Sequence, residues 1–298
     1  MIGYLRKRRV RKRLEGLLGS RPMMHMPDDL LAPESVAVCC GRSEERVWAS
    51  MYMAAALREH YGGERLHGFC APRDRELMAV VVEGDKIHDL PGDCLEAEEE
   101  LFRPSIVFCP YAGLTLEEAV DIAAPGCAVA GTADHPAVNL RVRVVGGHVL
   151  PESIRTMCEL LRISYPEDWA PRVPRNDLAR AEALLAPVSG HAMPYIAATS
   201  KAADVLRASG VEIPLKMVML DGDESPVGGA DRAVRAAVIA GATAVATDSG
   251  VVWSDACALG VPVVGLDRDG RFPGWEESPA NAAEPFVEGW KALLRRGW

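Results

Sequence analysis

Short apolar runs separated by amphipathic stretches recur along most of the chain. The runs contain small and β-branched residues and are bounded by turn residues, which is typical of strands buried on both faces of a sheet. They lie at residues 36–40, 66–71, 77–82, 86–90, 105–109 and 128–130. Residues 46–61 and 116–124 show the apolar spacing of helices. Strands that alternate with helices predict a parallel sheet covered by helices on both faces.

A second series of the same kind follows residues 165–174, a segment rich in proline, tryptophan and charge. Strands are expected at 195–199, 215–220, 243–247 and 261–266. Helices are expected at 149–161, 176–185 (capped by Asn176), 200–209, 230–240, 251–259 and 285–296. Residues 165–174 therefore mark the best domain boundary. The predicted organisation is a basic arm and linker (1–34), a first α/β domain (35–165) and a second one (175–298).

The arm reads as an amphipathic helix over residues 4–18. Val10, Leu14, Leu17 and Leu18 fall on one face, with arginines around them. Two interpretations are open: the helix lies on an anionic membrane through residues 1–20, or it packs on its own protein as a solvated basic helix. Residues 22–33 contain three prolines and read as a linker or a lid.

Composition and charge narrow the class of protein. With 298 residues, 49% hydrophobic and 25% charged, the chain has room for two domains of ordinary globular composition. No apolar run approaches the roughly 20 residues that cross a bilayer, and the start is too basic for a secretory signal. Residues 1–21 carry a net charge of +7, so the rest carries −16 of the total of −9. We expect a cytoplasmic protein without a broad nucleic-acid-binding face.

The cysteines and histidines do not form a recognisable metal or disulfide pattern. Eight cysteines are present, none in a CxxC pair, and several lie inside apolar runs such as VAVCC. This usage indicates a reducing compartment, and the scattered spacing of the seven histidines argues against a zinc site.

The most informative stretch is AGATAVATDSGVVWSDACALGVPVVGL, at residues 240–266. It reads as strand, loop, helix and strand, with Asp248, Ser249 and Gly250 forming the turn before the helix. Backbone amides at such a helix start, beside a hydroxyl and a glycine, can bind an anion. The alternative is a tight turn with no ligand.

Four segments together resemble glycosyltransferase family 9, the heptosyltransferase group. They are AVCCGRSEERVWASMYMAAALREHYGG, HVLPESIRTMCELLRISYPEDWAPRVP, DLARAEALLAP and AAVIAGATAVATDSGVVWSDACALGVPVVGL. The last segment is the specific one, because it is similar to the nucleotide-sugar motif of the family. The resemblance implies a GT-B fold, in which two Rossmann-like domains face each other across a cleft.

The resemblance also implies an activity. The second domain of the family binds a nucleotide-sugar donor, and the first binds an acceptor, usually a growing lipopolysaccharide core of the cell envelope. Transfer inverts the anomeric centre and needs a general base for the acceptor hydroxyl. Helix dipoles and side chains hold the leaving diphosphate, so neither a metal nor a cofactor is implied. The implied location is the inner face of the cytoplasmic membrane.

Carried over residue by residue, the match is incomplete in the first domain. The catalytic Asp of the family falls on Arg46. Glu45 and Glu44 are the adjacent carboxylates, and either serves as base if the loop is shifted by one or two residues. The alternative is a solvated charged loop.

In the second domain the resemblance implies donor binding by Lys201, Asp248, Ser249, Gly250 and Ser254. The histidine of the family falls on a tryptophan, VVW, and the spacing from DSG to ALG is one residue longer than usual. The alternative for Lys201, in the segment KAADVL, is an exposed lysine on a helix that binds no donor. Only SPVGG stands where the family has a further helix and strand, so the domain is short.

Three functions are compatible with the sequence. The first is a glycosyltransferase. The second is a binding or scaffold protein that kept the fold and lost catalysis, which the departures at Arg46 and Trp253 favour. The third is a relative of UDP-N-acetylglucosamine 2-epimerase, whose TDSG spacing fits residues 247–262 but whose GTRPE start is absent.

Overall fold

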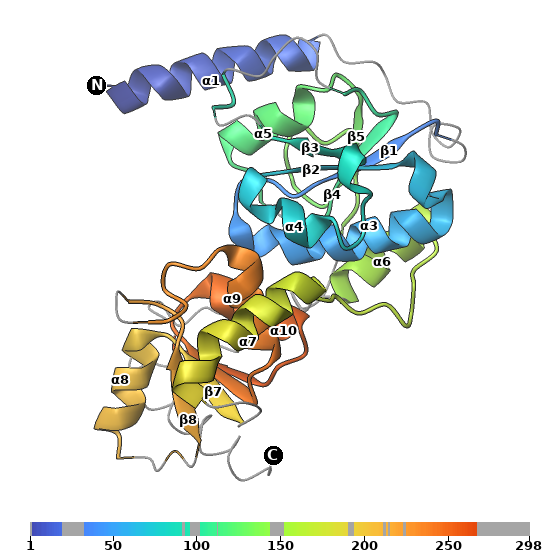
Figure 1. Cartoon of the computed structure of the whole chain (residues 1–298). Coiled ribbons are helices and arrows are strands. Elements are labelled where there is room, and N and C mark those ends of the chain that lie inside the picture. The colour runs from blue at the N-terminus through green and yellow to red at the C-terminus, as the bar shows by residue number, and fades with distance from the viewer. Residues whose placement is uncertain are drawn as a thin grey trace. The chain divides into compact units, whose positions relative to one another are not determined.

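The chain forms two compact α/β units in a computed structural model (Figure 1). The first unit ends at Ala170 and the second begins at Pro171, within the segment rich in proline and tryptophan. The structure describes residues 2–19, 33–90, 93–95, 102–111, 113–143, 152–189, 194–210, 213, 215–222 and 225–266.

The first unit is built on a six-stranded parallel sheet. Its strands are β1 (Val36–Cys39), β2 (Leu66–Cys70), β3 (Ile87–Asp89), β4 (Ile106–Cys109), β5 (Ala128–Gly131) and β6 (Leu140–Arg141). They are ordered β3-β2-β1-β4-β5-β6, the order of a Rossmann sheet. Val36 pairs with Leu66 on one side and Ile106 on the other, so β1 is central and its VAVC run is buried on both faces.

Helices cover both faces of this sheet. They are α1 (Ile2–Gly19), α3 (Val47–Tyr61), α4 (Arg75–Met78), α5 (Leu116–Ala123) and α6 (Glu152–Leu161), with 3-10 turns η1 (Glu44–Arg46), η2 (Gly63–Arg65), η3 (Pro72–Asp74) and η4 (Gly84–Lys86). One face packs on α5 and α1 around Ala37, Cys39 and Val107. Helix α3 lies against β1 and β2 and also contacts α6. The segment after α6 returns to α3, where the Trp169 ring meets Tyr52 at 4.9 Å between centroids.

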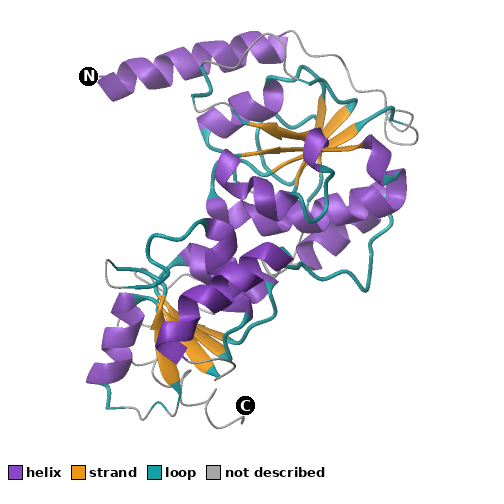
Figure 2. Ribbon diagram, in the orientation of Figure 1, coloured by secondary structure: helices purple, strands orange, loops and turns teal. Residues whose placement is uncertain are grey.

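The second unit has a four-stranded parallel sheet ordered β10-β9-β7-β8. Figure 2 shows its strands in orange and its helices in purple. Its strands are β7 (Tyr195–Ala198), β8 (Lys216–Met219), β9 (Ala244–Thr247) and β10 (Val263–Gly265), and its helices are α7 (Arg175–Ser189), α8 (Ser200–Ala208), α9 (Arg232–Ala240) and α10 (Gly250–Ala258). Helix α8 buries Ala202, Ala203 and Leu206 against one face. Helices α7, α9 and α10 pack together on the other side (Figure 1).

The amphipathic arm is a helix whose apolar face packs on the first unit. Val10 and Leu14 are 1% and 5% exposed and belong to the same core as α5. This is the packing that one of the two interpretations of the arm predicts. Among the described residues, no helix is long and apolar enough to cross a membrane.

The local predictions fail at a few places. Residues 77–82 are not a strand, because Leu77 and Met78 belong to α4 and pack as a short cover over the sheet. Gly68 of β2 makes room for this cover, since a Cβ there would lie 3.2 Å from Met78 Cγ. Asn176 is not a cap, because α7 already begins at Arg175. The predicted linker at 22–33 and the helix at 285–296 lie almost wholly or wholly outside the described residues.

Candidate functional site

The carboxyl edge of the four-stranded sheet contains a topological switch point. The chain leaves β7 towards β8 on one side, and β9 pairs on the other side. In open parallel sheets, ligands bind in the crevice at such a point, outside the carboxyl ends of the strands. Thr199 follows β7 and Asp248 follows β9, so both residues stand at this crevice.

Thr199 and Asp248 join the two strand ends. The Thr199 hydroxyl donates to Asp248 Oδ1 at 2.8 Å, and the Asp248 amide donates to Thr199 Oγ1 at 3.1 Å. Thr199 is buried, which protects this two-point link from competition by water. The link holds the starts of α8 and α10 in a fixed relation to each other.

Both helices begin at this crevice. Ser249 caps α10 by accepting a hydrogen bond from the Val252 amide, and the Ser249 amide donates to Thr247 Oγ1 at 2.9 Å. The Gly250 and Val251 amides have no partner among the described residues. The first-turn amides and the helix dipole give such a start a partial positive charge that favours an anion.

The start of α8 has the same character. The Ser200 amide and hydroxyl both donate to Asp221 Oδ1, at 2.6 Å and 2.7 Å. The next two amides, of Lys201 and Ala202, lack a partner in the part of the chain that the structure describes. Lys201 is exposed on the first turn of α8, where an ammonium adds to the positive end of the helix.

Asp221 is a further candidate residue at this edge, which the sequence patterns did not indicate. It lies just past the end of β8, 21 residues after Ser200. Rossmann sheets that bind nucleotides carry an acidic residue about 20 residues after the first turn, where it accepts hydrogen bonds from ribose hydroxyls. That spacing is the signal that would have identified Asp221.

Ser254 and Trp253 lie farther along α10. Both are half-buried, and the Trp253 amide donates to Ser249 O at 3.0 Å as part of the helix. The structure therefore brings together Lys201, Asp248, Ser249 and Gly250 at one edge, with Ser254 in the second turn of α10.

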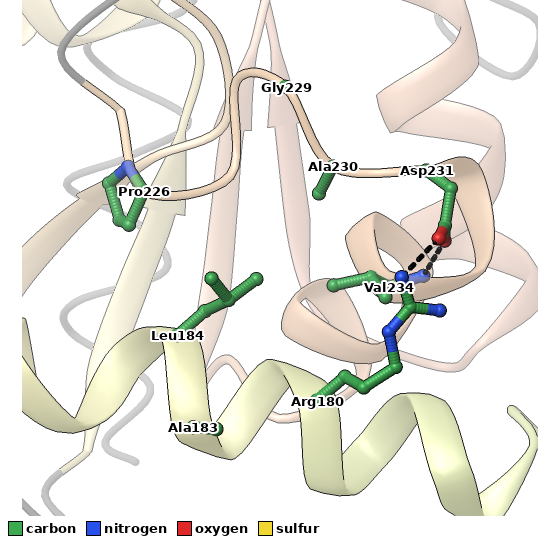
Figure 3. A pocket seen from close by; sticks show the side chains of 8 residues that line it. All are labelled: Arg180, Ala183, Leu184, Pro226, Gly229, Ala230, Asp231 and Val234. Atoms are coloured by element: carbon green, nitrogen blue, oxygen red, sulfur yellow. Dashed lines mark hydrogen bonds and ion pairs between the residues drawn. The ribbon is translucent and has the colours of Figure 1, made fainter.

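A pocket of about 700 Å³ lies between α7 and the loop that leads into α9 (Figure 3). Its lining is largely apolar, with one ion pair between Arg180 and Asp231 at 2.5 Å. Burial opposes ionisation of Asp231, but hydrogen bonds from the Val234 amide and Arg180 outweigh it and lower the pKa of Asp231. The residues that line the pocket are Arg180, Ala183, Leu184, Pro226, Gly229, Ala230, Asp231 and Val234.

The six-stranded sheet has its own switch point, between β1 and β4. Gly41 follows β1 with a φ of +67°, and a Cβ there would lie 2.9 Å from Glu118 Oε1 and 3.0 Å from the Tyr111 hydroxyl. Glycine is required at this turn for both reasons. The close approach brings the end of β1 against the first turn of α5.

Two buried carboxylates of α5 hold the loop after β1. Asp121 accepts from Arg42 Nε at 2.6 Å and Nη2 at 2.9 Å, and burial nevertheless raises the pKa of Asp121. Glu118 lies 2.6 Å from Arg46 Nη1 and accepts from the Arg42 and Thr115 amides. Burial opposes ionisation of Glu118, but these partners lower its pKa. Both carboxylates are thus engaged in holding arginines.

Arg46, onto which the family resemblance places the catalytic Asp, is held by two contacts. Its guanidinium pairs with Glu118, whose side chain is 1% exposed, and lies over the Tyr111 ring at 4.4 Å from the centroid. Glu44 belongs to η1, is 28% exposed and lies 3.6 Å from Arg73 Nε. Glu45 belongs to the same turn, and its side chain lies outside the described part of the structure.

In the part of each unit that the structure describes, the side chains do not form a metal centre. Within either unit, the described residues contain no group of three His, Cys, Asp or Glu side chains close enough to share one ion. His67 and His88 do form a pair, with Nδ1 of the first 3.1 Å from Nε2 of the second. Both rings stack on Phe102, at 3.9 Å and 4.8 Å between centroids. The two histidines are therefore held by packing against this aromatic ring.

The three-dimensional structure is similar to those of known glycosyltransferases. A glycosyl transferase of family 9 from Veillonella parvula has a TM-score of 0.55 at 9% identity, covering 89% of this chain and 98% of its own. The ADP-heptose lipopolysaccharide heptosyltransferase II of E. coli has a TM-score of 0.55 at 13% identity, covering 88% and 99%. A further E. coli heptosyltransferase, with ADP-2-deoxy-2-fluoro heptose, has a TM-score of 0.51 at 13% identity, covering 89% and 100%.

No family model and no curated protein sequence matches the chain. The likeness is thus one of fold. It confirms the expectation of two Rossmann-like units and the resemblance to family 9 at the level of the fold.

Proposed function

We propose that the chain is an inverting, metal-independent glycosyltransferase that moves a sugar from a nucleotide-sugar donor to a glycan or lipid-linked acceptor. The observation that carries this proposal is the crevice between β7 and β9, where α8 and α10 both begin and present amides without partners among the described residues. The fold likeness to the family 9 structures supports it, and one of those neighbours is a heptosyltransferase with an ADP-heptose analogue.

In this proposal the donor diphosphate lies across the two helix starts. The Gly250 and Val251 amides bind one phosphate, and Lys201 with its neighbouring amide binds the other. Asp221 accepts hydrogen bonds from the ribose, and Ser254 binds the sugar end of the donor. The two helix dipoles and the lysine stabilise the negative charge that develops on the diphosphate as its bond to the sugar breaks.

The acceptor hydroxyl attacks the anomeric carbon from the face opposite the diphosphate. The oxygen–carbon bond forms as the carbon–phosphate-oxygen bond breaks, and a carboxylate takes the hydroxyl proton. We assign this base to Glu45 or Glu44, in the turn between β1 and α3. The resemblance places the base at residue 46, which is an arginine, so we shift the base by one or two residues to the neighbouring glutamates. The carboxylates of Glu118 and Asp121 are not assigned as the base, because both are paired with arginines.

Release of nucleoside diphosphate from ADP-, GDP- and UDP-activated sugars tests the assignment. A solubilised glycolipid extract serves as the source of acceptor. A positioned base contributes about 10²–10⁴-fold, so either Glu44→Gln or Glu45→Gln should lower turnover at least about 100-fold while donor affinity stays within about twofold. Glu59→Gln, an exposed glutamate of α3, is the matched control.

If both variants turn over as fast as the wild type, neither glutamate is the base. Product formed without acceptor, as an epimer of a free UDP-sugar, would instead identify an epimerase.

The second candidate is a binding protein that retained the fold without catalysis. It is favoured by the ion pair of Arg46 with the buried Glu118, which puts a cation where the resemblance places the base of the family. This candidate predicts that a nucleotide-sugar binds at the β7–β9 crevice and is never consumed, with or without the glycolipid extract.

A further inference from the structure

The arm helix α1 is fixed on the first unit by its inner face. Val10 and Leu14 are buried in the core that contains α5. Arg6 pairs with Asp93 at 3.0 Å and with Glu117 at 3.3 Å, and Arg13 Nη1 donates to Leu95 O at 2.8 Å. These contacts leave one face of the helix turned away from the protein.

The outward side of α1 is strongly basic. Its basic residues are Lys7, Arg8, Arg9, Arg11 and Lys12, all exposed, and we call them the basic face. None of the five makes an ion pair or side-chain hydrogen bond within the described part of the chain. Tyr4 and Leu5, next to this face, are 72% and 49% exposed.

We propose that the basic face of α1 docks the protein on an anionic lipid surface. A helix of this length presents a strip of about 27 Å that lies flat on a membrane. Its charges meet the lipid headgroups while Tyr4 and Leu5 insert between them. The proposal goes beyond glycosyl transfer and holds for a catalytic or a binding protein alike.

Charge distribution favours a membrane over a nucleic acid. Residues 1–21 carry +7 and the remaining residues −16. A nucleic acid that wraps or extends beyond one helix would meet the acidic body, whereas a lipid surface needs only the exposed face of the arm. The anionic surface also repels the body, which orients the protein with α1 towards the membrane.

The arm packs against α5, the helix that also holds the candidate acceptor loop after β1. Glu117, at the start of α5, binds Arg6 of the arm, and the next residue, Glu118, binds Arg46 of the loop after β1. Asp121, one turn on, binds Arg42 of the same loop. Figure 1 shows α1 alongside α5 in the first unit. Helix α5 thus connects the docked arm with the loop after β1.

Cosedimentation with vesicles tests the proposal in the full-length protein. The vesicles contain one part phosphatidylglycerol to three parts phosphatidylcholine, and pure phosphatidylcholine vesicles are the neutral arm. Each basic residue contributes about fivefold in affinity near such a surface. Changing four of them to glutamine should therefore weaken binding by about two to three orders of magnitude. The four are Arg8, Arg9, Arg11 and Lys12.

The matched control changes four exposed arginines outside the arm to glutamine, so that the net charge falls equally. These are Arg65, Arg103, Arg172 and Arg207. A separate double variant, Tyr4→Ser with Leu5→Ser, should bind the vesicles more weakly than the wild type at every salt concentration. The reason is that it loses apolar contacts, which salt does not screen.

Binding to anionic vesicles that falls with salt, is lost in the arm variant and is kept in the control supports the proposal. Absence of binding to anionic vesicles overturns it, as does equal binding by the arm variant and the control. Tighter binding to single-stranded RNA than to the vesicles at the same salt concentration also overturns it. The measurement contains no nucleotide-sugar, so its failure leaves the proposed transferase untouched.

Discussion

The stacked pair of His67 and His88 is the clearest case of a residue whose chemistry is set by its neighbours. Across the 3.1 Å contact, one ring nitrogen must donate a hydrogen bond and the other must accept it. If both rings were protonated, two N–H groups would point at each other. Burial, with smaller contributions from His88 and Lys86, lowers the pKa of His67 to about 4, although Asp85 opposes the shift. Burial and Arg75 lower the pKa of His88 against the opposing effect of Asp89.

The pair predicts a pH-dependent stability. Between the ordinary histidine pKa of 6.5 and about 4, the unfolded chain binds more protons at His67 than the folded one. The free energy of unfolding should therefore fall as pH drops from 6.5 towards 4, and this contribution should stop changing below 4. Urea unfolding across this range should show a smaller slope in His67→Gln than in the wild type. An unchanged slope in His67→Gln would show that the pair does not couple folding to protonation, and His60→Gln is the control because it leaves the pair intact.

At the scale of elements, the arm helix α1 has two different faces. Its buried stripe contributes to the core, while its outer face remains charged. Removing a buried leucine side chain costs about 2–5 kcal/mol, because the lost burial adds to the cavity left behind. Leu14→Ala should therefore lower the free energy of unfolding of the first unit by about 2 kcal/mol or more.

The control for that prediction is Leu5→Ala on the same helix. Leu5 is 49% exposed, and substitutions at such positions usually change stability by less than about 0.5 kcal/mol. Equal effects of the two variants in urea unfolding would contradict the packing of α1 on the core.

The elements that the sequence predicts well are those with a strong local pattern. The VAVC run of β1 has no polar position, and a buried parallel strand is the structure that accommodates it. Residues 77–82 have an equally apolar pattern, yet they cover the sheet as a helical turn, because burial does not distinguish a strand from a short helix. Strand β6, of two residues, is too short to give any periodic signal.

At the scale of the whole molecule, what could be predicted about the site depends on sequence distance. The turn of Asp248, Ser249 and Gly250 is contiguous, so its strand–turn–helix context is visible in the chain itself. The link from Thr199 to Asp248 spans 49 residues, and the pair of Arg46 with Glu118 joins two distant segments. Such contacts can be predicted only when the order of the strands in the sheet is known, and no local sequence pattern gives that order.

Both units place charged loops at the carboxyl edges of their sheets, at the switch points that topology selects. In the first unit the loop after β1 is held by two carboxylates of α5. In the second, two helix starts are tied together by Thr199 and Asp248. We propose that the second of these edges binds the diphosphate of a nucleotide.

Calorimetric titration with ADP, GDP, UDP and their sugar derivatives tests this binding most directly. The titrations compare the wild type, Gly250→Pro and the matched control Gly250→Ala. Gly250 is the first residue of α10 and follows Ser249 at φ −101° and ψ 125°, a conformation that residues before proline adopt. Proline is common at the first position of a helix, and it lacks the amide hydrogen. A hydrogen bond to a charged group contributes about 1.5–3 kcal/mol. We predict that one nucleotide class binds the wild type and Gly250→Ala alike, and binds Gly250→Pro about 10- to 100-fold more weakly. Equal affinity in the two variants, or no binding of any nucleotide to the wild type, would contradict the claim.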